Sequence, residues 1–466
     1  MTREYRILAA VFVASRVLLA LLGFEFAFSL DWMFLADPSD LARRLLPTVW
    51  DFHAFPPGMN LLSGALLKLA PEHTATLARV CFEASGLVLV TSFYYLTRAL
   101  AVPAKLALGV AIAFSLLPPT LYLEHLYLYD YPAAALLALF SALLHRALVR
   151  PSQSAFFALF LTGAALVFLR SAFHLVWFAA VGGVVYAMVP TASRRALLQG
   201  AIGPALLCLA LYAKNYARFG VFGATSWGGA NVAAATSARL APEVRREWVR
   251  EGRLSRYAEL SVFSPPRAYL RFFGSPDSER YPELSALERP SLGSPNYNHW
   301  FFLEVNPARA ADARHYIQAR PLDYLATVFG TNLPQFFGPT TRWHPRDRTP
   351  ASPHHAHRKL LGGYERAYDA VVHGLPFSPV GLYLLLPLLL FASARRALRL
   401  FRARSEPIPT EAVLLAFLVV QIVFVTAVSV AFTFGECSRY RFLIEPLIVV
   451  LLLGWVARRC RPDPSR

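Results

Sequence analysis

The sequence predicts an all-α polytopic membrane protein, and three observations carry that prediction. Of the 466 residues, 56% are hydrophobic and only 16% are charged, whereas soluble domains carry about 25% charged residues. The mean hydropathy is +0.42. Apolar runs close to the ~20 residues that cross a bilayer recur along the chain. We expect about ten transmembrane helices and an external, periplasmic subdomain of short helices and loops.

The apolar runs predict the elements in order. The first span covers Tyr5 to Phe28. The run from Gly58 to Leu69 is too short to cross a bilayer and predicts an interfacial or re-entrant helix. The remaining spans are expected at residues 76–95, 105–122, 131–148, 155–169, 173–189 and 197–212, and, after a long polar region, at 380–393, 411–432 and 442–456.

This pattern divides the chain into three parts. Residues 1–213 form an N-terminal transmembrane module that contains a catalytic first external loop, residues 29–61. Residues 214–377 form the external subdomain, where a short helix is expected to begin at Pro242 and another to run from Tyr316 to Phe329. Residues 378–466 add the C-terminal transmembrane helices and a basic cytoplasmic tail.

The charge distribution predicts how the chain sits in the membrane. The formal net charge is +17, a balance also found in nucleic-acid-binding proteins. Here the cations cluster at the ends of apolar runs, which is how membrane topology is encoded. With the spans counted as above, all these clusters fall on one side. We therefore expect the cell inner (plasma) membrane, both termini in the cytoplasm, the active site outside, and no nucleic-acid partner. The clusters are Arg3 and Arg6, Arg98 and Lys105, Arg146 and Arg150, Arg194 and Arg195, the arginines from Arg395 to Arg404, and those from Arg458 to Arg461.

Several kinds of site have no signature in the sequence. The four cysteines show no CxxC or Cys/His spacing, so no zinc site, redox site or structural disulfide is expected. There is no P-loop, no GxGxxG and no Ser-His-Asp order. The first apolar run is too long for a signal-peptide core and lacks a cleavage site, so we expect it to remain as a span.

The segment from Asp31 to Leu61 is the most informative stretch. It contains four carboxylates, His53 and a Pro-Pro pair. An uncompensated charge in hydrocarbon is expensive, so this loop is expected in water or in a polar cleft at the membrane surface. The alternative is a plain turn before a membrane helix, in which Asp40 or Asp37 caps a helix N-terminus.

Two motifs in this loop carry a family resemblance. Asp37-Pro38-Ser39-Asp40 precedes His53-Ala54-Phe55-Pro56-Pro57 and a short apolar run. The segment resembles the GT-C superfamily of polytopic glycosyltransferases, in the branch of protein O-mannosyltransferases and bacterial lipid A aminoarabinose transferases. The resemblance covers residues 1 to about 216 and is weaker beyond. The sequence departs from the family in having His-x-x-Pro-Pro for His-Pro-Pro and in lacking the Asp-Glu pair, which leaves sugar and acceptor open.

The resemblance implies an inverting transfer from a polyprenyl-phosphate-linked sugar donor to a glycan, lipid or protein acceptor, with an Asp as general base. The reaction itself requires a base and cations. The acceptor hydroxyl has to lose its proton to a base, and cations have to stabilise the charge on the leaving phosphate. Asp37 is the predicted base, and the competing carboxylates are Asp31, Asp40 and Asp51.

The second external loop supplies further acidic candidates. Glu124 or Asp130 is expected to orient the acceptor or to bind a metal ion, so a divalent cation is the one possible cofactor. The alternative is an interfacial belt built from the tyrosines of this loop.

Six residues are predicted to contact the substrate, chiefly because cations near the membrane surface suit a lipid phosphate. The alternatives are snorkelling for Arg170, an interfacial anchor for Lys214, and ion pairs with Glu436 or Glu445 for the last two arginines. The six are His53, Arg170, Lys214, Asn215, Arg439 and Arg441. Two other functions stay open, a lipid-linked oligosaccharide flippase or transporter and a polyprenyl-pyrophosphate-dependent ligase or polymerase.

Overall fold

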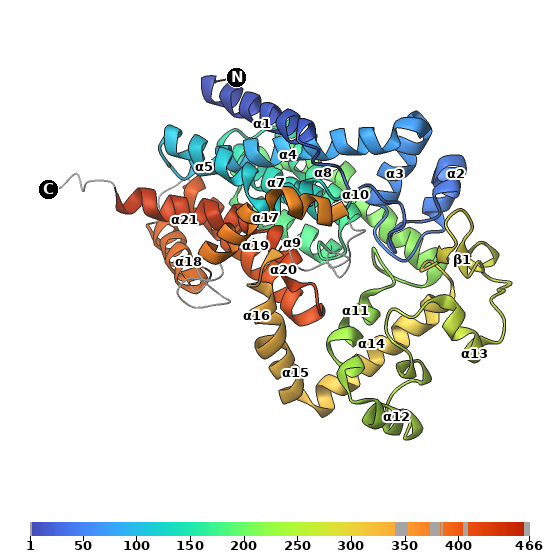
Figure 1. The fold of residues 1–466 in the computed structure, drawn as a ribbon. Coiled ribbons are helices and arrows are strands. Elements are labelled where there is room, and N and C mark those ends of the chain that lie inside the picture. The colour runs from blue at the N-terminus through green and yellow to red at the C-terminus, as the bar shows by residue number, and fades with distance from the viewer. Residues whose placement is uncertain (1, 341–352, 373–382, 384, 404–408, 461–466) are drawn as a thin grey trace.

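The computed structural model describes residues 2–340, 353–372, 383, 385–403 and 409–460. It consists of a helical bundle and one polar lobe that projects from it (Figure 1). Within the described ranges the only strands are the two-residue β1 (Glu288–Arg289) and β2 (Ser294–Pro295), which pair antiparallel. The expected all-α class is therefore confirmed.

The N-terminal half of the bundle follows most of the apolar runs, but the first helix ends at Leu21 and not at Phe28 as expected. The short helix expected from Gly58 to Leu69 has those bounds in the structure. The helices are α1 (Arg3–Leu21), α2 (Pro38–Trp50), α3 (Gly58–Leu69), α4 (Thr74–Ala99), α5 (Ala104–Leu116), α6 (Pro118–Glu124), α7 (Asp130–Val149), α8 (Gln153–Leu169), α9 (Leu175–Met188) and α10 (Arg194–Phe219).

Several helices are suited to a membrane. Four are long and apolar enough to cross one, at Pro71–Ala99, Asp130–Val149, Thr191–Phe219 and Thr410–Phe432. A fifth crossing is counted if the bent pair α5 and α6 forms one span. Helices α8 and α9 are apolar but shorter. The protein thus has apolar helices of membrane-spanning length, but the described residues do not establish the expected count of about ten.

The span expected over residues 105–122 is broken into two helices. Helix α5 ends at Leu116, and α6 starts at Pro118 after a bend of 57°. Proline disfavours the α conformation in the residue before it, and Leu117 is extended at φ −61° and ψ 142°. The bend directs the C-terminal end of α6 toward α1, where Glu124 meets Arg16.

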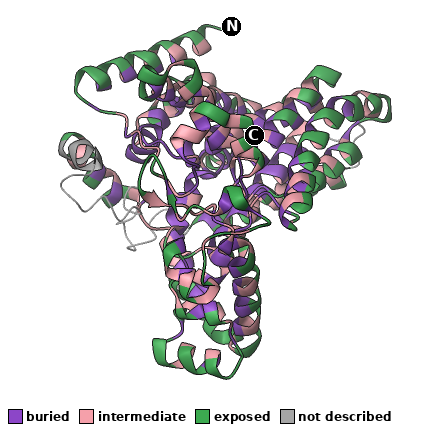
Figure 2. Ribbon diagram, turned by 90° about the vertical axis from the view of Figure 1, so that its right-hand side faces the viewer, coloured by how far each residue is buried: buried purple, intermediate pink, exposed green. Residues whose placement is uncertain are grey.

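The outer faces of the bundle are apolar. Figure 2 shows exposed residues along the outside of the helices and buried residues between them. Lipid acyl chains accommodate apolar side chains as well as a protein core does, whereas large apolar surface patches are uncommon on soluble monomers. Examples on α1, α10 and α19 are Val17, Leu18, Leu206, Leu207, Val420 and Val423.

The polar lobe is built around α11 and α14, which pack very closely. A Cβ on Gly229 would lie 2.0 Å from the carbonyl oxygen of Asn306, so this contact requires glycine. Helix α12 begins at Pro242 as predicted. The helix expected from Tyr316 to Phe329 is wrong, because Pro321 starts a new helix. The lobe and the segment that leads from it back to the bundle contain α11 (Gly228–Ala235), α12 (Pro242–Arg250), α13 (Leu270–Phe273), α14 (Phe301–Ala319), α15 (Pro321–Thr327), a π-helical turn (Val328–Asn332) and α16 (Leu333–Phe336).

The C-terminal part closes the bundle. The span expected over residues 380–393 begins outside the described residues and continues as α18. The span expected over 442–456 corresponds to a single helix that begins three residues later, at Glu445, with Pro446 in its first turn. The elements are α17 (Pro353–Val372), α18 (Leu386–Arg402), α19 (Thr410–Phe432), α20 (Cys437–Phe442) and α21 (Glu445–Arg459).

The first loop shares a core with the polar lobe. Leu41, Phe52 and Ala54 are buried in one apolar cluster with residues of α11 and α14, including Ala230 and Phe302. The segment singled out as catalytic in the sequence is therefore held between the bundle and the lobe.

Candidate functional site

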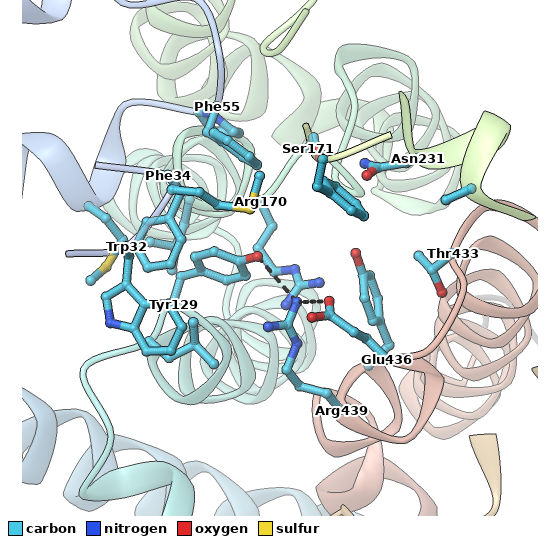
Figure 3. A pocket seen from close by; sticks show the side chains of 18 of the residues that line it. Trp32, Phe34, Phe55, Tyr129, Arg170, Ser171, Asn231, Thr433, Glu436 and Arg439 are labelled. Carbon is cyan, nitrogen blue, oxygen red and sulfur yellow. Dashed lines mark hydrogen bonds and ion pairs between the residues drawn. The ribbon is translucent and has the colours of Figure 1, made fainter. Parts of the chain in front are cut away.

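A cavity of about 270 Å³ lies where the first loop, the end of α8, α11 and α20 meet. Aromatic side chains of the first loop form one wall, and polar side chains from the other elements face them (Figure 3). The residues used below are Trp32, Phe34, Phe55, Tyr129, Arg170, Ser171, Asn231, Glu436, Arg439 and Tyr440.

Two arginines converge on this cavity through one buried carboxylate. Asp130, the first residue of α7, is fully buried and forms an ion pair with Arg170, which follows the last residue of α8. Its other oxygen lies 3.3 Å from Nε of Arg439 in α20. A buried charge has to be paired, and Asp130 satisfies this requirement for both guanidinium groups at once. The arrangement fixes two cations side by side at the cavity wall.

Glu436 is the carboxylate that faces the cavity. Its Oε2 lies 2.7 Å from Nη2 of Arg439, and the same nitrogen donates to the Tyr129 hydroxyl at 3.3 Å (Figure 3). The side chain of Glu436 is 44% exposed and that of Asp130 is 0%, so a bound molecule can reach only the former. Gly435, at φ +84°, supplies the left-handed turn that separates α19 from α20.

The formal charges of this cluster cancel. Arg170 and Arg439 carry one positive charge each, and Asp130 and Glu436 one negative charge each. The guanidinium of Arg170 also lies 4.1 Å above the ring of Tyr440, which adds a cation–π contact. An anion entering the cavity finds two arginines but has to compete with Glu436 for one of them.

Asp37, the predicted base, does not line this cavity. It is the N-cap of α2, and its Oδ1 accepts from the amide of Ser39 at 2.8 Å and from the hydroxyl at 2.5 Å. Its Oδ2 accepts from the amide and the hydroxyl of Ser291 at 2.8 and 2.9 Å. Burial raises the pKa of Asp37, but these hydrogen bonds outweigh burial and lower it overall. The capping interpretation is confirmed for Asp37.

The other first-loop carboxylates also lie elsewhere. Asp40 and Asp51 line a separate cavity of about 110 Å³ together with Asp37. Asp40 pairs with Arg44 at 3.1 Å on the surface, and Asp51 pairs with Arg218 at 3.1 Å. Asp40 is not the cap of α2, because it lies inside the first turn.

His53 is buried and ties the first loop to the lobe. Its Nε2 lies 3.0 Å from the carbonyl oxygen of Asn298, and its Nδ1 lies 2.8 Å from the Ser226 hydroxyl. A carbonyl can only accept, so Nε2 carries the hydrogen and Nδ1 accepts from Ser226. Burial lowers the pKa of His53 to about 3, so the ring is neutral. Phe55 and Pro56 from the same motif do line the cavity.

Lys214 and Asn215 stabilise the lobe boundary. The Lys214 ammonium donates to the carbonyl oxygens of Trp50 and Phe52 at 3.1 and 2.8 Å, at the C-terminal end of α2. Asn215 donates to the carbonyl oxygen of Gly223 at 2.5 Å. The structure brings neither residue to the two-arginine cavity.

Glu124 and Arg441 are both locked in buried ion pairs. Glu124 pairs with Arg16 of α1 and accepts from the Tyr131 hydroxyl at 3.1 Å. Arg441 pairs with Glu445 at 2.8 Å, which confirms the ion-pair alternative, and Nη1 donates to the carbonyl oxygen of Gly338 at 2.8 Å.

The residues expected to hold a divalent cation do not fit that role. The carboxylates of Glu124 and Asp130 are each occupied by arginine. Across the part of the chain that the structure describes, no group of three or more His, Cys, Asp or Glu side chains is arranged to hold a metal ion.

Two residues that shape the site were missed in the sequence. The buried Arg289 of β1 donates to the carbonyl oxygens of Leu30 and Trp32 at 3.2 and 3.0 Å and pairs with Asp31. Asn60 of α3 accepts from the amide of Ala36 at 2.7 Å. Asn60 was visible as a polar residue in an apolar helix, but nothing local to Arg289 marks its role. Together they fix the loop that carries Trp32 and Phe34.

An apolar groove adjoins the cavity. A second space, of about 730 Å³, lies between α9 and α19 and is lined almost wholly by apolar side chains such as Trp177, Val181 and Phe424. Ser171 lines both spaces. The cavity with two arginines is therefore next to an apolar groove between α9 and α19.

Comparison with protein-family models, curated proteins and solved structures finds no match to this chain.

Proposed function

We propose that this protein is a membrane glycosyltransferase that moves a sugar from a polyprenyl-phosphate-linked donor to an acceptor on the non-cytoplasmic face, with inversion at the anomeric carbon. One observation carries the proposal. The cavity with Arg170 and Arg439 and the apolar groove between α9 and α19 share Ser171. A ligand that fills both spaces has an anionic headgroup and a long hydrocarbon chain.

The parts of such a donor match the parts of the site. The phosphate fits Arg170 and Arg439, because guanidinium groups bind phosphate oxygens with two parallel hydrogen bonds. The polyprenyl chain fits the groove lined by Trp177 and Phe424. The sugar fits against Trp32 and Phe34, whose rings are stacked 5.7 Å apart and present apolar faces at the cavity wall.

The GT-C-like architecture of about ten spans, the cytoplasmic termini and the inner membrane belong to this proposal. The basic C-terminal ends of α18 and α21, which meet the N-terminal end of α19, support a common cytoplasmic side. Arg396 of α18 and Arg458 of α21 both pair with Glu411 of α19, at 2.9 and 3.5 Å. These basic helix ends therefore gather at one place.

The charge of the cavity favours a transferase that uses a monophosphate carrier. A sugar linked to polyprenyl phosphate carries one negative charge, whereas a pyrophosphate-linked donor carries two. Two arginines that already face Asp130 and Glu436 suit the smaller charge. A flippase would need an open polar path through the bilayer, and the buried charges at Glu124 and Arg441 are closed in ion pairs instead.

The test uses the full chain in lipid nanodiscs. The protein is incubated with synthetic polyprenyl-phosphate hexoses, pentoses and aminopentoses, with their pyrophosphate-linked counterparts, and with a membrane extract as acceptor source. The released polyprenyl phosphate and pyrophosphate are quantified by mass spectrometry. We expect one donor class to be consumed. Consumption of pyrophosphate-linked donors alone would favour the ligase or polymerase. Movement of an intact lipid-linked oligosaccharide across the bilayer of sealed proteoliposomes, without donor consumption, would favour the flippase. Either result would contradict the proposal.

A further inference from the structure

We propose that Glu436 is the general base of the transfer and that donor phosphate releases it for this role by binding Arg439. The inference rests on the proposed function and deepens it. It assigns the proton acceptor to α20 rather than to the acidic loop before α2.

The first step is to ask which carboxylates an acceptor hydroxyl can reach. Of the carboxylates in the described residues, Glu436 is the one that lines the cavity with Arg170 and Arg439. Asp37 lies outside that cavity, and both its oxygens are occupied by Ser39 and Ser291. A base has to lie within hydrogen-bond reach of the proton that it removes. Position therefore favours Glu436.

The second step concerns the ion pair that occupies Glu436 in the empty site. One of its oxygens lies 2.7 Å from Nη2 of Arg439, so in the empty site that oxygen is already occupied by the guanidinium. The same nitrogen is among the groups that an entering phosphate would bind. Because a phosphate oxygen and Glu436 compete for one donor, binding of the donor lipid frees the carboxylate next to the reacting carbon.

The third step is the charge balance. Without Glu436, the cluster of Arg170, Arg439 and Asp130 has one net positive charge, which matches the single negative charge of a sugar phosphodiester. During transfer, the acceptor O–H proton moves to Glu436 and the acceptor oxygen bonds to the anomeric carbon. The bond from that carbon to the phosphate oxygen breaks, and its electron pair stays on the phosphate. Glu436 is then neutral, so the more negative product phosphate does not face a second anion.

The experiment separates binding from transfer. Undecaprenyl phosphate is titrated onto the full chain in nanodiscs, and turnover is measured with the donor that wild type consumes. For Glu436→Gln we expect affinity for undecaprenyl phosphate at least equal to wild type, because the competitor for Arg439 is weakened. We expect turnover to fall about 100-fold or more, the usual contribution of a general base.

A matched control lies on α12. Glu243 pairs with Arg246 in the same i,i+3 arrangement as Glu436 with Arg439, but on the surface at 3.4 Å. Glu243→Gln should leave both affinity and turnover at wild-type values. Glu436→Asp keeps the negative charge on a side chain that is one methylene shorter. For this variant we expect partial turnover and a thermal unfolding midpoint close to that of wild type. This second variant keeps the test informative if Glu436→Gln folds poorly.

Two results would overturn the inference. Turnover of Glu436→Gln within about threefold of wild type would remove Glu436 as base, since a base contributes far more. Weaker undecaprenyl phosphate binding in Glu436→Gln would contradict the competition for Arg439. Failure of the proposed function is a different outcome, namely a wild type that binds no undecaprenyl phosphate and consumes no donor.

Discussion

Oδ2 of Asp37 accepts two hydrogen bonds from Ser291, at 2.8 Å from its amide and 2.9 Å from its hydroxyl. The two residues are 254 positions apart, and the contact joins the start of α2 to the turn between β1 and β2. Arg289, two residues earlier, holds the carbonyl oxygens that precede Asp37. The turn of the polar lobe thus clamps the loop whose aromatic side chains form a wall of the cavity.

The first prediction concerns Asp37→Ala. Loss of a helix N-cap costs about 1 kcal/mol, and Ser291 would also lose its acceptor. We expect a lower unfolding midpoint in detergent and a loss of transfer no larger than the loss of folded protein. If Asp37 were the base, transfer would vanish while the amount of folded protein stayed the same.

The pH dependence of the same variant gives an independent check. The folded pKa of Asp37 lies below its usual value, so its stabilising contribution is present above the unfolded pKa and is lost as pH falls through the folded pKa. The stability difference between wild type and Asp37→Ala should therefore be constant near neutrality and shrink below about pH 4. A difference that grows on acidification would contradict this assignment.

The second prediction concerns His53. Its folded pKa is about 3, whereas an unfolded histidine titrates near 6.5, so the folded state keeps the ring neutral. The contribution of the neutral ring is present above pH 6.5 and is lost progressively as pH falls from there toward 3. We expect wild type to lose more stability than His53→Gln between pH 7 and 5 in thermal unfolding. Parallel curves for the two proteins would show that His53 titrates normally.

The third prediction concerns Arg289→Gln. The substitution leaves several carbonyl oxygens of the first loop without a donor, and we expect roughly 2 kcal/mol or more of destabilisation. Because Trp32 and Phe34 would shift, KM for the donor should rise more than kcat falls. The control is Arg267→Gln, which removes an exposed arginine that pairs with Glu288 at 3.4 Å in the same region. Equal effects of the two variants would contradict the positioning role.

The fourth prediction concerns the apolar groove. Ala180 on α9 lines the groove, and Ala180→Trp should fill part of it. We expect weaker binding of undecaprenyl phosphate and unchanged binding of farnesyl phosphate, whose chain is much shorter. Ala179→Trp is the matched control, because Ala179 is exposed on the same helix and does not line the groove. If Ala180→Trp weakened the binding of both lipids equally, the polyprenyl chain would not lie in this groove.

The sequence predicted the helical class and most helix positions, since apolar runs and proline act locally. The short helix α3 and the Pro242 start of α12 are examples. The bend before α6 was missed although Pro118 and Pro119 were visible, because the run remains apolar across the break. The helix boundary at Pro321 was also missed, although this proline was visible in the sequence.

The site was predicted in part. Arg170 and Arg439 were singled out as cations near the membrane surface, and both line the cavity. The capping role of Asp37 was visible as an alternative, but its contact with Ser291 and the contacts of His53 and Lys214 are ones that no local pattern reveals. Their partners are carbonyl, amide and hydroxyl groups that folding brings together, often from more than 160 residues away. Glu436 was considered only as the partner of an arginine, because its access to the cavity depends on the fold.

The central claim is that Arg170 and Arg439 bind the phosphate of a polyprenyl lipid. The most direct measurement is a cryo-electron microscopy structure of the full chain in nanodiscs with undecaprenyl phosphate. We expect the phosphate within hydrogen-bond distance of both arginines, the chain along α9 and α19, and Glu436 separated from Arg439. A phosphate bound instead in the cavity beside Asp37 and Asp51, or an empty two-arginine cavity at saturating lipid, would contradict the account.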